Sequence, residues 1–454
     1  MNEDDGPARI EAAEFYGRTT LHPIGLSFLL AMILAVLLLP RKYAIWPAIF
    51  IGCFISPAQR IVLFTANFPF MRILLIFALV RVISRQEFSG LRFRDIDRVM
   101  IAHALARLTV YTIQQQTMKA FIYQAGTSID ELITYFIFRA LVRSFDDFRG
   151  MTLGFLVASI PVAIAFAFEY STRRNVFSIL GGVPLITEMR EGKLRCRGAF
   201  SHTLMAGCYW SAILPLAVAG WFDPRQRKLL TITSAGCCLL IIVTTSSSTP
   251  LMGVIFGIVG ACLFPLRRQM KAVRWALLIT LLLLHFVFLK GPVWSLIAKV
   301  NIFGGSTGWH RTHLIDRAVA LFGEWWLWGT TDTEHWGWGL HDVTNQFILE
   351  GVIGGALTMG LFTTLIVLTF RNLGRILRSR VVTNSRSDTI LIWSLGVAVF
   401  VHIMNFLAVS YFGQITMLIW LPFAVAASLS DTVTDQDRRD RLSKMSRMTY
   451  AATS

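Results

Sequence analysis

The chain has 454 residues, of which 54% are hydrophobic and only 15% are charged, and its formal net charge is +16. Apolar stretches long enough to cross a hydrocarbon core about 30 Å thick recur along its whole length, so a soluble globular protein is excluded. The basic residues are dispersed over short loops between these stretches. This pattern is typical of a membrane protein oriented by the positive-inside rule, and it argues against a nucleic-acid partner.

Residues 1–21 form a polar tail before the first apolar stretch. The tail holds five acidic residues against only Arg9 and Arg18, which is the wrong charge for the n-region of a signal peptide. We therefore expect the first hydrophobic helix to be retained.

Thirteen apolar segments follow, and they predict an all-α, polytopic transmembrane bundle of about 12–13 helices. Ten segments are clear, at 23–39, 62–80, 153–168, 202–221, 229–245, 249–266, 275–289, 347–370, 390–407 and 414–429. Three are short or carry charge, at 43–56, 98–114 and 129–142. Because each backbone polar group in lipid has to be paired within its own helix, we expect residues 1–454 to form one integral membrane domain.

The loop charges predict how the bundle is oriented. The basic loop at 371–386 and the basic C-terminal tail at 430–454 are separated by two spans, and both are expected in the cytoplasm. Counting back along the chain places other basic loops on the same side, at 81–98, 143–149, 225–228 and 267–274. Two long loops, 170–201 and 291–345, then lie on the opposite side.

The first of these far-side loops is basic, against the rule. It carries six lysines and arginines against Glu188 and Glu191. Cations that the topology disfavours need another reason, and the commonest is an anionic ligand. Arginine suits phosphate because its planar fork donates two parallel hydrogen bonds and stays charged. Arginines at the membrane rim that bind lipid headgroups are the alternative.

The second far-side loop, 291–345, has an unusual composition. Its 55 residues hold seven of the 13 tryptophans and four of the nine histidines of the chain. Six of these tryptophans are too dense for an interfacial belt, which indicates that the loop carries the chemistry. Flat aromatic faces are typical platforms for sugar rings, and a small tryptophan-packed core within the loop is equally consistent with the composition.

Several motifs in this part of the chain resemble the O-antigen ligase and polymerase family. They are residues 197–202 (RGAFSH), 245–248 (TSSS), 306–318 (STGWHRTHLIDRA), the tryptophan pair 325–326 and residues 342–355 (DVTNQFILEGVIGG). Their order and spacing match the family over roughly residues 169–355, whereas the first 150 residues match only as hydrophobic spans.

The resemblance implies a GT-C-like fold in the bacterial inner membrane, with both long loops in the periplasm. It also implies an enzyme that transfers a glycan from a polyprenyl-diphosphate carrier to a hydroxyl group, with no cofactor and with other polysaccharide assembly proteins as potential partners. Ligases of the family usually place a histidine directly before the asparagine that opens the late helix. Here Thr344 precedes Asn345, and the nearest histidine is His341. This departure favours a polymerase or a divergent transferase.

The residue types fit such a transfer without a metal, since no group of Asp, Glu and His has a convincing metal spacing. Fixed arginines would stabilise the charge that develops on a departing diphosphate. We expect Arg197 and Arg311 to form this clamp, supported by Arg195 and Arg317.

A neutral imidazole or a carboxylate would accept the proton of the acceptor hydroxyl, and His341 or Asp342 is our candidate, with His310 as a further one. The residues expected to contact the glycan are Trp309, Trp325, Trp326, Trp336 and Asn345. Asn345 is equally expected to cap the helix that follows it.

A multi-span transporter or a flippase of lipid-linked glycans is the alternative from another functional class. Transporters place binding groups near the membrane midplane and often show halves related by a repeat. The intramembrane ionisable residues here show no apparent pairing and no repeat in the sequence: His103, Arg107, Arg139, His285 and His402. Neither a transporter nor a non-enzymatic scaffold would explain the large aromatic loop, so we favour the transferase.

Overall fold

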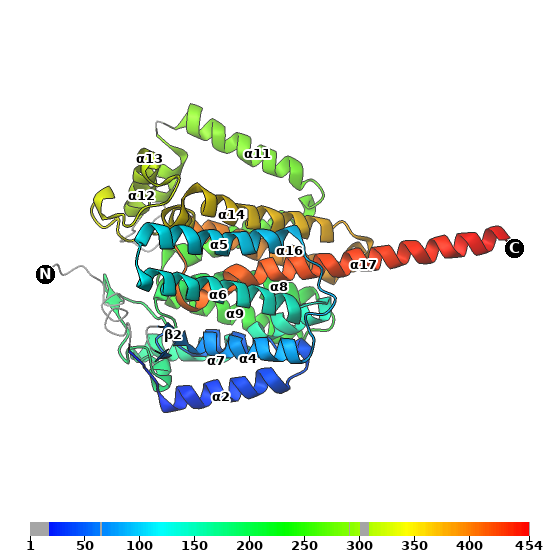
Figure 1. Ribbon diagram of the computed structural model, residues 1–454, viewed down its shortest axis with the longest axis horizontal. Helices are drawn as coiled ribbons and strands as arrows, with labels where there is room; N and C mark the ends of the chain where they lie inside the picture. Colours follow the sequence, from blue (N-terminus) through cyan, green and yellow to red (C-terminus); the bar gives the residue numbers. More distant parts are fainter. Residues whose placement is uncertain (1–17, 64–65, 290, 300–307, 454) are drawn as a thin grey trace.

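The computed structural model describes residues 18–63, 66–289, 291–299 and 308–453, with side chains left undescribed at 297–299 and 437–453. Most of the expected N-terminal tail, residues 1–17, and residues 300–307 of the large loop lie outside this part. Most of the helices run side by side along one common direction (Figure 1), and the strands of the described residues form two short hairpins. The protein is therefore all-α, as its composition predicts.

Each of the thirteen apolar segments lies in or overlaps a helix. The helices are α2 (Pro23–Leu38), α3 (Trp46–Phe54), α4 (Phe70–Ser84), α5 (Asp95–Gln115), α6 (Met118–Leu141), α7 (Phe145–Thr172), α8 (Thr203–Ala219), α9 (Lys228–Thr244), α10 (Ser248–Cys262), α11 (Met270–Leu283), α14 (Gln346–Ile376), α16 (Arg386–Phe406) and α17 (Met417–Thr453). Six helical stretches of the described residues are long and apolar enough to cross a membrane, and three shorter helices are apolar as well. These helices make the chain a membrane protein.

One predicted span begins in the wrong place. The segment 62–80 was expected to be helical throughout, but α4 begins only at Phe70. Before it, β1 (Arg60–Leu63) and β2 (Ala66–Pro69) pair as an antiparallel hairpin. A short run of β-branched and apolar residues suits a strand as well as a helix, so hydropathy alone does not separate the two.

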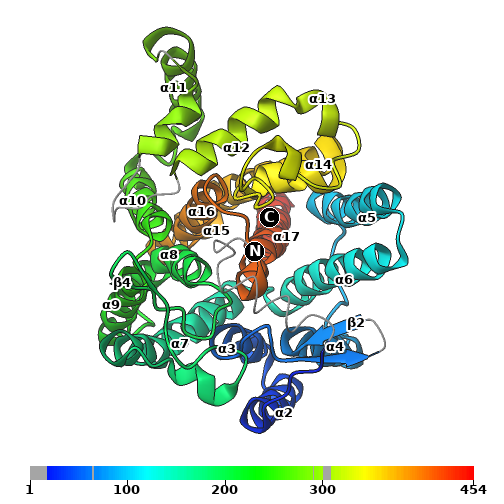
Figure 2. The same ribbon diagram turned by 90° about the vertical axis from the view of Figure 1, so that its left-hand side faces the viewer.

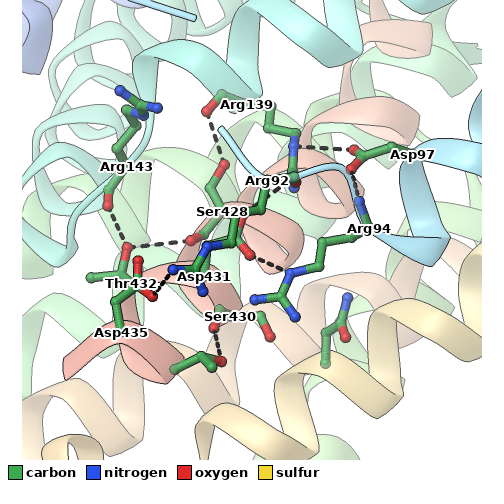
Figure 3. A network of polar contacts seen from close by, with 12 residues as sticks. Arg92, Arg94, Asp97, Arg139, Arg143, Ser428, Ser430, Asp431, Thr432 and Asp435 are labelled. Carbon is green, nitrogen blue, oxygen red and sulfur yellow. Dashed lines mark hydrogen bonds and ion pairs between the residues drawn. The ribbon is translucent and has the colours of Figure 1, made fainter. Parts of the chain in front are cut away.

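The three weaker segments are also helices, and the charges of the two that carry them, in α5 and α6, have partners in the fold. At one end of the bundle, Arg139 of α6 pairs with Asp97 of α5 at 3.1 Å and with Asp431 of α17 at 3.0 Å (Figure 3). The side chains of Arg139 and Asp97 are each only 1% exposed. Arg94 also pairs with Asp431, and the Ser428 hydroxyl donates to the Arg139 carbonyl oxygen at 2.9 Å. This network fastens α17 to the α5–α6 pair. The expectation that Arg139 lacks a partner was therefore wrong.

The two long loops lie at the same end of the bundle. The first contains the 3₁₀ helix η2 (Val176–Leu180) and the strands β3 (Met189–Arg190) and β4 (Lys193–Leu194). Figure 2 looks onto this end and shows β4 together with the helices of the second loop. The projecting part of α17 and the C-terminal end of α14 lie at the opposite end (Figure 1). This arrangement agrees with the relative sides predicted from loop charge.

Helix α14 is broken near its start. Gly354 (φ −153°, ψ 25°) and Gly355 (φ 70°, ψ −165°) leave the helical conformation and divide α14 into a short first part and a long second part. The large loop binds to the break, because the Ala356 N–H donates to the Trp326 carbonyl oxygen at 2.6 Å and the Thr330 N–H donates to that of Val352 at 3.0 Å. Irregular backbone within a membrane helix is tolerated where other protein groups form hydrogen bonds with its free N–H and C=O groups.

Candidate functional site

The large loop folds into a small unit on the first part of α14. It contains η6 (Val293–Lys299), α12 (Gly308–Ala320), α13 (Phe322–Trp325) and η7 (Glu334–Trp336). A separate hydrophobic core holds these elements together, and its buried members are Leu314, Ala318, Trp325, Trp336, Leu340, Val343 and Ile348. Because Ile348 belongs to α14, this core also joins the loop to the bundle.

The tryptophans of the loop divide into two groups. Trp325 and Trp336 are only 5% and 1% exposed, and the Trp325 indole donates to the Ala318 carbonyl oxygen at 2.8 Å. These two side chains therefore belong to the packed core of the loop, and the prediction that they contact the glycan was wrong. Trp309 and Trp326 are 61% and 46% exposed, and the Trp309 ring stacks on the His313 ring with their centroids 5.0 Å apart.

Arg311 extends from α12 toward the bundle. Its Nε atom is buried without a hydrogen-bond partner among the described residues. Burial lowers the pKa of its guanidinium, and the thiol of Cys208 in α8 is close enough to interact with it electrostatically. A buried guanidinium nitrogen that donates no hydrogen bond is costly, and such groups mark places where an anion can bind.

The backbone at Arg197 is held in place by the buried carboxylate of Glu169. Glu169, at the end of α7, is fully buried and accepts hydrogen bonds from the backbone N–H groups of Arg197 and Gly198, each at 3.0 Å. Gly198 has a φ of +57°, and a Cβ atom there would lie 2.3 Å from the Phe166 ring. Only glycine fits this turn. The Arg197 guanidinium is half-buried and donates to the Ser201 carbonyl oxygen at 3.5 Å.

The Arg195 guanidinium donates a hydrogen bond to the Ser247 hydroxyl at 3.3 Å. Burial lowers the pKa of this guanidinium.

His202, at the start of α8, is a candidate that we did not single out from the sequence, although it ends the RGAFSH motif. Its Nδ1 accepts a hydrogen bond from the Leu204 N–H at 3.0 Å, which leaves the proton on Nε2. Burial first, and then the nearby Arg195, Arg197 and Arg190, lower its pKa to about 3. His202 is therefore a neutral hydrogen-bond donor at physiological pH.

Arg195 and Arg197 lie near His202 at the start of α8, whereas Arg311 lies near Cys208 in the second turn of the same helix. The His202 ring lies 6.3 Å from that of Phe412. Thr249, at the start of α10, is 3% exposed, and its hydroxyl has no hydrogen-bond partner among the described residues. The unpaired N–H groups and the dipole of a helix N-terminus add to the positive potential of the arginines.

Two other predicted residues of the loop, Arg317 and His310, have hydrogen-bond partners within the loop. Arg317 donates from Nε to the Trp336 carbonyl oxygen at 2.6 Å. His310 Nε2 lies 2.9 Å from the Gly339 carbonyl oxygen, and its Nδ1 lies 3.5 Å from the Thr344 hydroxyl. Both residues therefore hold the loop together. The supporting role in the clamp that was expected for Arg317 stays a prediction.

The end of the loop contains the residues expected to act as base and as cap. His341 and Asp342 are exposed in the turn before α14. Asn345 caps α14, since its side-chain oxygen accepts from the N–H groups of Phe347 at 3.0 Å and Ile348 at 3.1 Å. The capping role expected for Asn345 is thus confirmed, and its side chain is 4% exposed.

Ionisable residues within the helices are paired, contrary to the expectation from the sequence. His103 and Arg107 of α5 contact Glu350 and Glu131, with His103 Nε2 3.1 Å from Glu350 and an Arg107 nitrogen 2.5 Å from Glu131. His402 Nδ1 lies 3.0 Å from the Tyr411 hydroxyl. The partners are distant in sequence, and no local signal pointed to them.

Arg195 and Arg197 thus lie together near His202, and Arg311 approaches the same helix, α8, from the large loop. No protein-family model matches this chain, and no curated protein matches its sequence.

Proposed function

We propose that this protein is a membrane glycan transferase, which polymerises or ligates polysaccharide units carried on a polyprenyl diphosphate at the periplasmic face of the bacterial inner membrane. The observation that carries the proposal is that Arg195 and Arg197 lie near His202 at the start of α8, while the buried Arg311 lies near Cys208 in the next turn of that helix. The bilayer would hold the lipid tail of the donor, and other polysaccharide assembly proteins are potential partners.

In the proposed reaction, the oxygen of an acceptor hydroxyl attacks the anomeric carbon of the donor sugar. The bond from that carbon to the diphosphate oxygen breaks, and the diphosphate leaves with the electron pair. The arginines and the Nε2–H of His202 would stabilise this developing charge more strongly than the ground state. The proton of the hydroxyl passes to a base, for which His341 and Asp342 remain the candidates, and Trp309 and Trp326 would contact the glycan.

The test is transfer by the purified protein in lipid vesicles, with a polyprenyl-diphosphate-linked oligosaccharide as donor. We expect longer or transferred glycans together with released polyprenyl diphosphate. His341→Ala or Asp342→Asn should abolish product per inserted molecule if that residue is the base. Asn345→Ala should instead reduce abundance, because loss of a helix cap costs about 1 kcal/mol.

Near-normal specific activity in both His341→Ala and Asp342→Asn would place the base elsewhere. No transfer by the wild-type protein with any lipid-linked donor would overturn the proposed function.

A transporter or flippase of lipid-linked glycans is the second candidate, and the paired buried charges and the broken α14 favour it. Broken helices and intramembrane ionisable residues are typical of transport sites. A transport function does not account for the arginines at one end of the bundle. The vesicle assay separates the two functions, since a flippase moves the lipid-linked glycan across the bilayer without forming a new glycosidic bond.

The proposal also predicts the sidedness of the loops. In a Cys262→Ser background, which removes the one exposed cysteine of the described residues, a cysteine at the exposed Thr331 should react with a membrane-impermeant label in cells whose outer membrane has been permeabilised. A cysteine at the exposed Asn384 should react only after lysis. The opposite pattern would exclude periplasmic transfer.

A further inference from the structure

A cluster of four ionisable side chains is buried between α5, α6 and α14. His103 and Arg107 come from α5, Glu131 from α6 and Glu350 from the first part of α14, and their exposed fractions are 0%, 8%, 4% and 0%. Arg107 lies 2.5 Å from Glu131 and 3.6 Å from Glu350, while His103 Nε2 lies 3.1 Å from Glu350. The cluster is separate from the arginine group at the start of α8.

The charges of this cluster do not balance without an added proton. Arg107 supplies one fixed positive charge, whereas Glu131 and Glu350 supply two negative charges when both are ionised. With a neutral His103, a net charge of −1 would be buried in a low dielectric, which is costly when it is uncompensated. One proton on the histidine or on a carboxylate removes the imbalance.

The neighbouring elements do not supply the missing positive charge. Asp130, next on α6, forms a two-pronged pair with Arg72 of α4, with both contacts at 2.7 Å. Tyr111 and Tyr123 are within electrostatic range of Arg107, but a phenol hydroxyl brings no positive charge. Toward α14 and α17, the His103 ring faces Phe362 at 6.0 Å and Trp420 at 5.8 Å, and both rings are uncharged.

The unused hydrogen-bonding atoms show where a proton fits. His103 Nδ1 and Glu131 Oε2 are both buried without a hydrogen-bond partner among the described residues. They lie 3.8 Å apart. A proton on either atom would let the two groups interact as donor and acceptor, while His103 Nε2 keeps its contact with Glu350.

We propose that this cluster is an intramembrane binding site for one exchangeable proton, shared between His103, Glu131 and Glu350. In such a coupled site the proton belongs to the cluster as a whole. The site is connected to the loop end of the protein through Gln346, whose side chain donates to Glu350 at 3.0 Å and accepts from the Tyr411 N–H at 2.9 Å. Binding or release of the proton would therefore act on the first part of α14 and on the segment that contains Tyr411.

The test is an infrared titration of the whole purified protein in lipid nanodiscs, recorded as pH-difference spectra in H₂O and D₂O. Raising the pH above neutrality should remove one band of a protonated carboxylic acid or of an imidazolium from the wild-type spectrum. Glu131→Gln and Glu350→Gln each leave Arg107 balanced by one carboxylate, so both variants should lose this band change. Glu334→Gln, at an exposed position of the large loop, should keep it.

A wild-type spectrum without such a change, or a change that persists in both glutamine variants, would overturn the proposal. If neither glutamine variant inserts, His103→Asn takes their place and should alter or remove the band, because it removes one of the three groups that share the proton, and an unchanged band would overturn the proposal. The readout does not depend on glycan transfer, so the proton site and the proposed function can fail independently.

Discussion

Replacing Arg311 by lysine is expected to reduce glycan transfer about 10²–10³-fold while the protein still inserts in normal amounts, because a donor aimed at developing negative charge is worth roughly this much. Lysine keeps one positive charge but loses the planar fork that can bind a diphosphate through two hydrogen bonds. The buried Nε of Arg311, which has no partner among the described residues, is the donor that lysine lacks. Arg197→Lys should act in the same direction. The measurement is the initial rate of transfer per inserted molecule.

Arg317→Lys is the matched control on the same helix. The Arg317 guanidinium donates to the Trp336 carbonyl oxygen inside the loop, so its replacement should lower the stability and abundance of the protein more than its specific activity. If Arg311→Lys and Arg197→Lys both keep wild-type rates, these arginines do not bind the leaving group.

Replacing Gly355 by alanine should destabilise the protein by about 3 kcal/mol or more, since this backbone region is almost confined to glycine and the site is tightly packed. At φ +70°, a Cβ atom on residue 355 would lie 2.5 Å from the Leu327 carbonyl oxygen and 2.8 Å from that of Trp326. The break in α14 and the loop bound to it would both have to move. We expect a lower thermal unfolding midpoint and less inserted protein.

Gly360→Ala tests whether this effect belongs to the break. Gly360 lies in the second part of the same helix, and a Cβ atom there meets no neighbour within 4 Å. Alanine is the better helix former by about 1 kcal/mol, so this variant should match or exceed wild-type stability. Equal losses at both positions would mean that α14 tolerates no added side chain and that the break is not special.

The positions of the helices could be predicted because hydrophobicity and length are local properties. A run of apolar residues long enough to cross a membrane has to form a helix wherever its neighbours lie. The same holds for the relative sides of the loops, which follow from charge counts, and for the cap at Asn345, which depends on the next three residues. Hydropathy failed once, at the hairpin that precedes Phe70, because a short run of apolar and β-branched residues fits a strand as well as a helix.

Local reasoning was weaker for the roles of individual side chains in the large loop. Trp325 and Trp326 are adjacent, yet one is buried in the loop core and the other is exposed. Arg311 and Arg317 lie on one short helix, but Arg311 extends toward α8 and Arg317 binds the loop backbone. Composition predicted a loop rich in aromatic residues. Which of its side chains face the core depends on how each helix of the loop packs in the folded protein.

The sequence by itself determined a membrane bundle with two long loops at one end, since each span and each loop charge can be read from residues next to one another. Tertiary structure alone decided how the buried charges are paired. His103 meets Glu350 across 247 positions of the chain, and Arg139 meets Asp431 across 292. Whether a charge within a helix is isolated or compensated depends on which helices pack together, and that is a property of the whole bundle.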